Sequence, residues 1–249
     1  MIEFFGGSAP NPLKVLIAME ELKLPYNSHN LDVVNGALKT PEYLVINPNS
    51  KIPAIIDNEG PDGTSMPLAE SGAILWYLAE KHGKFIPANP RDRYATLQWL
   101  MFQMSGIGPM FGQYVYFTRR VENQPHGVER YTTEVLRLYD VLERRLSESR
   151  FLACDEYTVA DIATFPAICY VKVTGLDRSK YPNITRWLDE IAERPAVIRA
   201  REVMGHLDRV EGRCRIICAR SYGDNQVDRQ PLLGGPPVKR AAGLSLSLS

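Results

Sequence analysis

Residues 51–83, KIPAIIDNEGPDGTSMPLAESGAILWYLAEKHG, carry a continuous strand, turn, strand and helix pattern. KIPAIID reads as a buried strand, the glycine-containing DNEGPDG as a turn, and SMPLA as a short partner strand. ESGAILWYLAEKHG, residues 70–83, has the apolar spacing of an amphipathic helix, and Gly83 is a usual C-terminal stop. A hairpin that leads directly into a helix indicates a mixed α/β unit.

The residues before this stretch supply the rest of that unit. An apolar segment at 2–5 precedes a helical pattern at 12–22, and a polar segment at 26–33 reads as a second strand with a weak pattern. TPEYLVINP, residues 40–48, reads as a short helix with a threonine cap and a proline at its first position. The order strand, helix, strand, helix, hairpin, helix predicts a compact unit of thioredoxin size.

The pattern becomes purely helical after GKFIPANPRDR, residues 83–93, whose prolines and charges are typical of a linker. One of the later helices opens with TVAD, a capping arrangement ahead of an apolar run. The predicted helices lie at 91–119, 128–149, 158–173, 184–194 and 195–207. We therefore predict a thioredoxin-like N-terminal domain at 1–83, a linker at 84–92, an all-α C-terminal domain at 93–211 and an irregular, disordered tail at 212–249.

Composition excludes several classes of function. Lys plus Arg and Asp plus Glu are each 29, so the net charge is zero and neither nucleic acid nor an anionic membrane is an expected partner. No run of 18 apolar residues and no signal-peptide pattern occurs, which favours a cytoplasmic protein. The four cysteines form no CxxC pair and no zinc spacing, so we expect no disulfide framework and no metal.

The first candidate site is FFGGSAPNPLKV, residues 4–15, at a strand-to-helix junction. Asn11 is a good N-cap and Pro12 a good first helical residue, which is a purely structural interpretation. A helix N-terminus also presents donors and partial positive charge to an anion such as a thiolate, and Ser8 and the Asn11 amide are further donors. The two glycines would let the backbone approach a ligand closely.

The second candidate site is the proline that opens the strand of KIPAIID. Pro53 is tolerable at a strand start, and a cis Ile52–Pro53 bond would explain its position. Such a bond would expose the backbone groups of Ile52 to a peptide ligand.

The third candidate site is AESGAI, at the N-terminus of the helix that follows the hairpin. Ser71 could simply cap that helix, or it could hold a carboxylate together with the helix N–H groups. Glu70 beside it could bind an ammonium, so the pair suits one end of a zwitterionic amino acid.

An aromatic and methionine-rich segment, residues 101–117, could line an apolar substrate pocket beside these sites, although helical spacing is equally typical of core. Three glycines and a proline at 106–112 interrupt its pattern and predict a kink or close packing.

The motifs NPNSKIPAI, LAESGAILWYLAEK and TVADIA occur in this order, and residues 1–205 resemble a cytosolic glutathione S-transferase. LQWLMFQMSGIGPMFGQ and VERYTTEVLRLYDVLERRL resemble the bacterial nu-class members and the related yeast nitrogen-regulator protein. The resemblance implies the glutathione S-transferase fold, glutathione as co-substrate, reduction of small glutathione-containing disulfides, and a homodimer.

The resemblance also implies where glutathione binds. It makes Pro53 the cis proline and pairs the backbone of Ile52 with the cysteinyl part of glutathione. Glu70 and Ser71 would hold the γ-glutamyl end, and Lys51 would lie near the glycyl end.

The resemblance departs from the nu-class pattern at the sulfur. A Thr-Pro-Asn triplet is typical there, whereas this chain has Ala9-Pro10-Asn11. Either Ser8 substitutes for the missing hydroxyl, or thiol activation depends on Asn11 and the helix end. Arg130 matches an arginine placed to meet a second glutathione, or it is an exposed salt-bridging residue.

The expected function is therefore a glutathione S-transferase-like enzyme that stabilises the glutathione thiolate and uses it to reduce small disulfides or attack an apolar electrophile. One alternative is conjugation or thioether cleavage of aromatic substrates. The other is a non-catalytic regulatory protein that binds glutathione, which the alanine at position 9 would favour.

Overall fold

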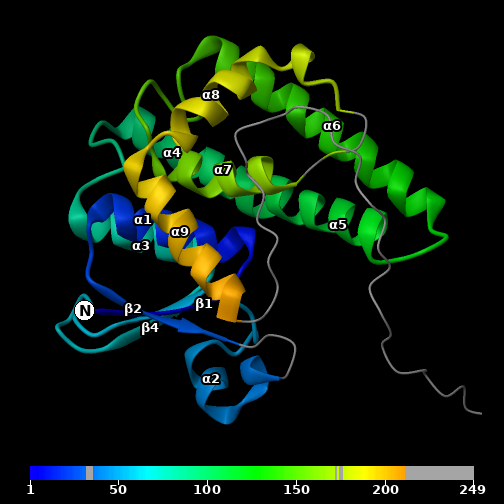
Figure 1. Cartoon of the computed structure of the whole chain (residues 1–249). Helices are drawn as coiled ribbons and strands as arrows, with labels where there is room; N and C mark the ends of the chain where they lie inside the picture. The colour runs from blue at the N-terminus through cyan, green and yellow to red at the C-terminus, as the bar shows by residue number, and fades with distance from the viewer. Residues whose placement is uncertain (32–35, 172, 174–175, 211–249) are drawn as a thin grey trace, which may run out of the picture. The chain divides into compact units, whose positions relative to one another are not determined.

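The computed structural model describes residues 1–31, 36–171, 173 and 176–210. All of its strands precede Ser71, and helices alone follow Pro90 (Figure 1). This order confirms the predicted fold class, whereas the domain boundaries at 83 and 92 stay predictions. The predicted tail, 212–249, lies outside the described residues.

A four-stranded mixed sheet forms the centre of the N-terminal part. The first strand pairs in parallel with the second and antiparallel with the third, and the fourth closes the hairpin. The second strand, YNSHN, is largely exposed at a sheet edge, which explains its polar and weakly periodic sequence. The strands are β1 (Ile2–Gly6), β2 (Tyr26–Asn30), β3 (Ala54–Asp57) and β4 (Met66–Ala69), in the order β2-β1-β3-β4.

Three helices flank this sheet: α1 (Pro10–Leu22) and α3 (Ser71–His82) lie together on one face and α2 (Pro41–Ile46) on the other (Figure 1). Gly83 ends α3 in the left-handed conformation, as predicted. The first helix also contacts two helices of the C-terminal part, so residues 12–19 are buried without interruption. It is therefore a central element of the molecule rather than a surface helix.

The C-terminal part is helical, and the predicted helix at 91–119 consists of two helices joined by a π-helical turn, η2 (Gln103–Ile107). The interruption overlaps the predicted kink at Gly106, whereas Gly108, Pro109 and Gly112 lie within the second helix. The TVAD capping box is confirmed, because Thr158 and Asp161 bond reciprocally at the start of α7. The helices are α4 (Pro90–Phe102), α5 (Gly108–Arg119), α6 (Pro125–Glu148), α7 (Val159–Tyr170), α8 (Pro182–Ala192) and α9 (Pro195–Val210).

One apolar core runs through both parts. It joins Phe4 of the sheet and Leu16 of α1 to Ile162 of α7 and Trp187 of α8, all fully buried. A site between the sheet and the helices is therefore bounded on both sides by tightly packed elements.

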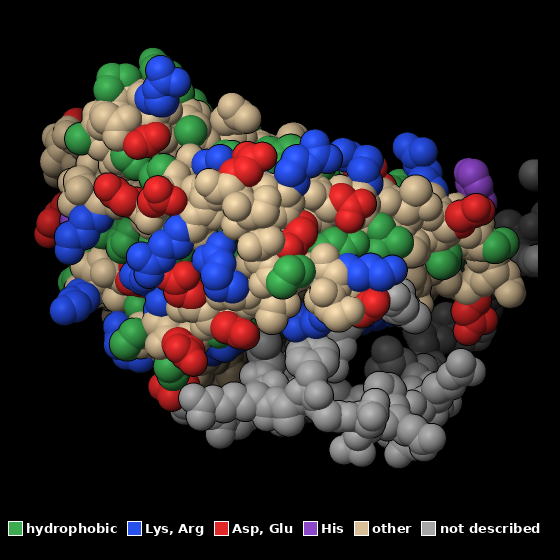
Figure 2. All heavy atoms as spheres, turned by 90° about the horizontal axis from the view of Figure 1, so that it is seen from above, with side chains coloured by type: hydrophobic (Ala, Val, Ile, Leu, Met, Phe, Trp, Pro, Cys, Tyr) green, Lys and Arg blue, Asp and Glu red, His purple; other side chains and the backbone are tan. Residues whose placement is uncertain are grey.

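Acidic and basic side chains are interspersed on the face shown in Figure 2. In the part of the chain that the structure describes, no helix is both long enough and apolar enough to cross a membrane.

Candidate active site

The first helix begins earlier than its sequence predicts. It starts at Pro10, and Ala9 is its extended N-cap residue with no side-chain capping bond. The prediction that Asn11 is the N-cap and Pro12 the first helical residue is therefore wrong. The fixed φ of Pro10 already suits a helix, so the helix starts at the first of the two prolines. The exposed Asn11 amide is consequently not used for capping.

The first turn of α1 has few donors for a ligand. Pro10 and Pro12 carry no N–H, and the N–H of Leu13 donates to the carbonyl of Ala9 at 3.2 Å. Asn11 is thus the residue of this turn that can offer both a backbone and a side-chain donor.

The two glycines before this helix serve packing. A Cβ at Gly6 would lie 2.4 Å from the ring of Phe4, and one at Gly7 would lie 3.2 Å from Cδ1 of Ile52. The protein's own side chains fill the space in front of both residues, so the expected close approach of a ligand is not what requires these glycines.

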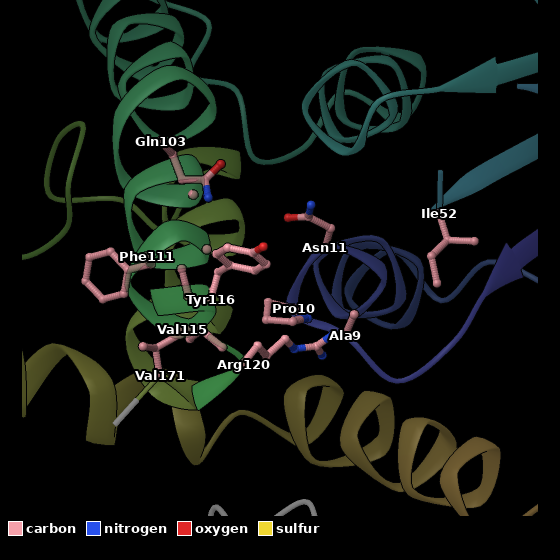
Figure 3. A pocket seen from close by; sticks show the side chains of 13 residues that line it. Ala9, Pro10, Asn11, Ile52, Gln103, Phe111, Val115, Tyr116, Arg120 and Val171 are labelled. Atoms are coloured by element: carbon pink, nitrogen blue, oxygen red, sulfur yellow. The ribbon is translucent and has the colours of Figure 1, made fainter. Parts of the chain in front are cut away.

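A cavity of about 390 Å³ separates the α1 N-terminus from α5 and α7 (Figure 3). The Asn11 amide faces α5, and the Tyr116 hydroxyl and the Arg120 guanidinium extend toward α1. Cys154 and Cys169, the cysteines among the described residues, do not line the cavity. The lining residues are Ala9, Pro10, Asn11, Ile52, Gln103, Gly108, Phe111, Gly112, Val115, Tyr116, Arg120, Ala167 and Val171.

The Ile52–Pro53 bond is cis, as predicted. β3 begins only at Ala54, so Ile52 lies outside the sheet register and lines the cavity. The carbonyl of Lys51 accepts from the hydroxyl of Tyr43 at 2.6 Å and from Nδ2 of Asn47 at 2.7 Å. These two bonds fix the loop, whereas the Lys51 side chain is exposed and lies outside the cavity lining.

Glu70 and Ser71 lie at the β4–α3 junction. Ser71 is the first helical residue, is 3% exposed, and directs its hydroxyl to Sδ of Met104 at 3.9 Å. The capping interpretation of Ser71 is therefore wrong, because Glu70 is the N-cap residue and makes no side-chain cap bond. Glu70 has φ 68° and ψ 113°, a conformation that is costly for a residue with a Cβ. Such strain is a hallmark of functional positions.

A buried lysine next to the cavity was not found from the sequence. Lys14 is 1% exposed, and its Nζ donates to Oε1 of the fully buried Gln103 at 2.9 Å. Burial lowers the pKa of Lys14 to about 7, and the Glu70 carboxylate partly opposes this shift. The Lys14 ammonium therefore lies within electrostatic range of the β4–α3 junction as well as of the cavity. The lysine within the apolar run LKVLI was the available signal.

The structure brings some predicted residues together and leaves others apart. Asn11 and Ile52 share the cavity. Ser8 is exposed and does not line it. Arg130 lies on α6 in a separate hollow with Met110. Of the aromatic and methionine residues predicted at 101–117, Phe111 and Tyr116 line the cavity, whereas others such as Met101 and Tyr114 do not.

No group of three or more His, Cys, Asp or Glu side chains among the described residues is arranged to hold a metal ion.

Comparison with known proteins assigns the family. The family "Glutathione S-transferase, N-terminal domain" matches residues 9–81, and "Glutathione S-transferase, C-terminal domain" matches residues 102–195. The disulfide-bond oxidoreductase YfcG of Escherichia coli K12 is 42% identical over 202 residues, which cover 80% of this chain and 94% of that protein. The chain belongs to the glutathione S-transferase family.

Two crystal structures are similar to this chain over most of its length. A glutathione transferase family member from Pseudomonas fluorescens pf-5, with two glutathione bound, has a TM-score of 0.74 and 42% identity, and the match covers 80% of this chain and 91% of that chain. A glutathione transferase from Pseudomonas putida, with one glutathione disulfide bound per subunit, has a TM-score of 0.76 and 40% identity, and the match covers 82% and 92%.

Proposed function

We propose that this protein binds glutathione, stabilises its thiolate through Asn11, and uses that thiolate to reduce small disulfides. The observation that carries the proposal is the Asn11 amide, which no cap uses and which opens on a cavity shared with Ile52. A relative at 42% identity is named a disulfide-bond oxidoreductase, and similar structures hold glutathione or its disulfide, which supports the same chemistry here.

Glutathione would lie along the N-terminal part of the site. We assign the backbone of Ile52 to its cysteinyl unit, because Ile52 is outside the sheet ladder and next to the cavity. Glu70 would bind the γ-glutamyl ammonium, Ser71 with the α3 N-terminus would bind the γ-glutamyl carboxylate, and Lys51 would lie near the glycyl carboxylate.

The thiol of glutathione, like free cysteine, is mostly protonated at neutral pH, so a donor that favours the thiolate accelerates attack. The Asn11 amide would donate to that sulfur beside the positive end of α1. The thiolate attacks one sulfur of a disulfide, a mixed disulfide forms, and the other sulfur leaves as a thiolate that takes a proton from water. Ser8 remains a candidate second donor, and a role of Arg130 toward a second glutathione stays a prediction.

The test is reduction of hydroxyethyl disulfide by glutathione, coupled to glutathione reductase. We expect Asn11→Ala to lower kcat/KM roughly ten- to hundredfold, the effect of removing a hydrogen bond to an anion. Ser8→Ala tests the second candidate donor, and Ser65→Ala in the exposed hairpin is the control. An ultraviolet titration of the bound thiolate should show a higher thiol pKa in Asn11→Ala than in the wild type.

Each other outcome reassigns the site. If Ser8→Ala is as slow as Asn11→Ala, the two side chains share the thiolate. If Asn11→Ala retains full activity, backbone donors carry the role. Glutathione binding by calorimetry without turnover of any disulfide would favour the regulatory alternative.

A second candidate function is conjugation of glutathione to an apolar aromatic electrophile. The side of the cavity opposite Asn11 favours it, because Phe111, Val115 and Val171 provide a mainly apolar wall. Turnover of 1-chloro-2,4-dinitrobenzene faster than that of hydroxyethyl disulfide would establish it.

We also propose a homodimer formed through α3 and α4. A hollow of about 720 Å³ between these helices is lined mainly by apolar side chains, including Trp76, Leu97 and Met101. Met101 is 49% exposed and nearby Tyr94 is 69% exposed, which favours burial against a second copy. Light scattering should give twice the chain mass of 28.1 kDa. Met101→Glu should give the single mass, and Val45→Glu, on the exposed side of α2, should not.

A cytoplasmic location is part of the same proposal, because glutathione is the reductant it requires.

A further inference from the structure

The side-chain amide of Gln103 has one hydrogen-bonding group in use and one without a partner. Oε1 accepts from Nζ of Lys14 at 2.9 Å. Gln103 is fully buried, yet its Nε2 has no hydrogen-bond partner among the described residues. A buried unpaired donor lowers the stability of the fold, so its presence needs an explanation such as a role in binding or catalysis.

The orientation of this amide is fixed by charge. As an ammonium, Lys14 can only donate, so in that form it binds the oxygen of Gln103 and turns Nε2 away from itself. Nε2 lies against Gly108, where a Cβ would approach it to 3.1 Å, and both residues line the cavity. Figure 3 shows the Gln103 amide on the η2 side of the cavity, across from the Asn11 amide of α1.

The charge behind the amide makes its N–H a stronger donor. An ammonium on Oε1 draws electron density from Nε2, and the surroundings are buried, so the effect is weakly screened. Glu70 is the carboxylate that acts on Lys14. Its charge favours the ammonium form, so it supports the polarised state of Gln103.

Two donors on opposite walls suit a reaction with two charged sulfurs. Disulfide exchange has an attacking sulfur and a leaving sulfur, and negative charge passes from the first to the second. Asn11 is assigned to the attacking sulfur. The leaving sulfur, on the opposite side, becomes negatively charged only as the disulfide breaks. A donor that is already oriented toward this developing charge stabilises the transition state and so accelerates the reaction.

Resting on the proposed function, we propose that Nε2 of Gln103 donates to the leaving sulfur during disulfide exchange, with Lys14 as its positioning residue. The glutathione thiolate forms a new sulfur–sulfur bond with the near sulfur of the substrate. The old bond breaks, its electron pair stays on the far sulfur, and that thiolate then takes a proton from water. Gln103 gives up no proton in this step.

The experiment compares two neutral disulfides that differ in their leaving thiolates. Hydroxyethyl disulfide releases a basic alkyl thiolate, and 4,4′-dithiodipyridine releases a weakly basic one that leaves readily without help. Gln103→Met keeps the volume and removes the donor. We expect it to lower kcat/KM about tenfold or more for hydroxyethyl disulfide and less than about threefold for dithiodipyridine, after subtraction of the uncatalysed rate.

Gln113→Met is the matched control, because Gln113 is exposed on α5 and does not line the cavity. Gln103→Leu, checked with Gln103→Met for an unchanged melting temperature and glutathione affinity, provides a second removal of the donor. Equal losses with both disulfides, or no loss with either, would overturn the role of Gln103 and leave the proposed function standing. A wild type that reduces neither disulfide would overturn both.

Discussion

Two fully buried polar side chains of the same core, Asp161 of α7 and Gln103 of η2, differ in how completely they are bonded. Asp161 accepts four hydrogen bonds: from the N–H of Leu152, Nε1 of Trp187, and the N–H and hydroxyl of Thr158, at 2.9 to 3.0 Å. Gln103 receives one bond, from Lys14, and its N–H₂ group has no partner in the described part of the chain.

Burial disfavours the charged forms of both Asp161 and Lys14, which shifts their pKa values in opposite directions. It raises the pKa of Asp161, because desolvation outweighs the bonds to the carboxylate, and it lowers the pKa of Lys14 to about 7. The satisfied carboxylate joins three chain segments and does not line the cavity beside Asn11. The half-satisfied amide lines one, so incomplete bonding beside open space is the feature that separates a site from a structural centre.

The largest expected effect tests the structural side of this comparison. Asp161→Ala should lower the free energy of unfolding by about 3 kcal/mol or more, because it leaves several buried donors unpaired. Urea unfolding measures it, and Asp189→Ala, an exposed change on α8, should cost about 0.5 kcal/mol or less. Similar costs for the two variants would contradict the structural role of Asp161.

The burial of Lys14 is tested by the pH dependence of the free energy of unfolding. The folded pKa of Lys14 is depressed below the unfolded value, so between the two the unfolded chain binds the extra proton and stability rises with pH. From pH 7 to pH 9 this contribution is about 2 kcal/mol. Urea unfolding at both pH values should show that the free energy of unfolding rises by this amount more in the wild type than in Lys14→Met, which has no group that titrates at position 14. Parallel pH dependences would show that Lys14 is not buried as described.

Ser71 offers a smaller change that sharpens the functional side. Ser71→Ala should weaken glutathione binding about five- to tenfold, the loss of one hydrogen bond to a carboxylate. Calorimetry measures the affinity, with Ser65→Ala in the exposed hairpin as control. An unchanged affinity would remove the γ-glutamyl assignment.

The smallest expected effect concerns stability at Asn11. Asn11→Ala should change the free energy of unfolding by less than about 0.5 kcal/mol, because Asn11 does not cap α1, whereas loss of a cap costs about 1 kcal/mol. A urea midpoint measures it alongside the activity assay. A loss of 1 kcal/mol or more would mean that Asn11 supports the helix as well as the sulfur.

The features predicted correctly from sequence depend on short-range chemistry. The Thr158–Asp161 capping box, the Gly83 stop and the cis bond before Pro53 each follow from a few neighbouring residues. The break in the helix at 91–119 was likewise foreseen from its glycines and proline, although its π-helical form was not.

The features that sequence reasoning missed depend on long-range packing. α1 packs against α3, α7 and α9, so no amphipathic pattern marks Lys14 as buried. Its partner Gln103 is 89 residues away in the chain. The α1 start was misplaced because two prolines, Pro10 and Pro12, both fit a first turn and local rules do not choose between them.

The π-helical turn η2 sets the rotational phase of α5 relative to α4. A π-helical turn is in effect a one-residue insertion into a continuous α-helix, and one residue corresponds to a rotation of about 100°. Deleting a residue there and restoring regular geometry would turn Tyr116 and Arg120 away from α1 together. The π-helical turn thus determines which face of α5 lines the cavity opposite Asn11. A single insertion or deletion at this turn would place a different face of α5 there, while the side of the cavity assigned to glutathione stays unchanged.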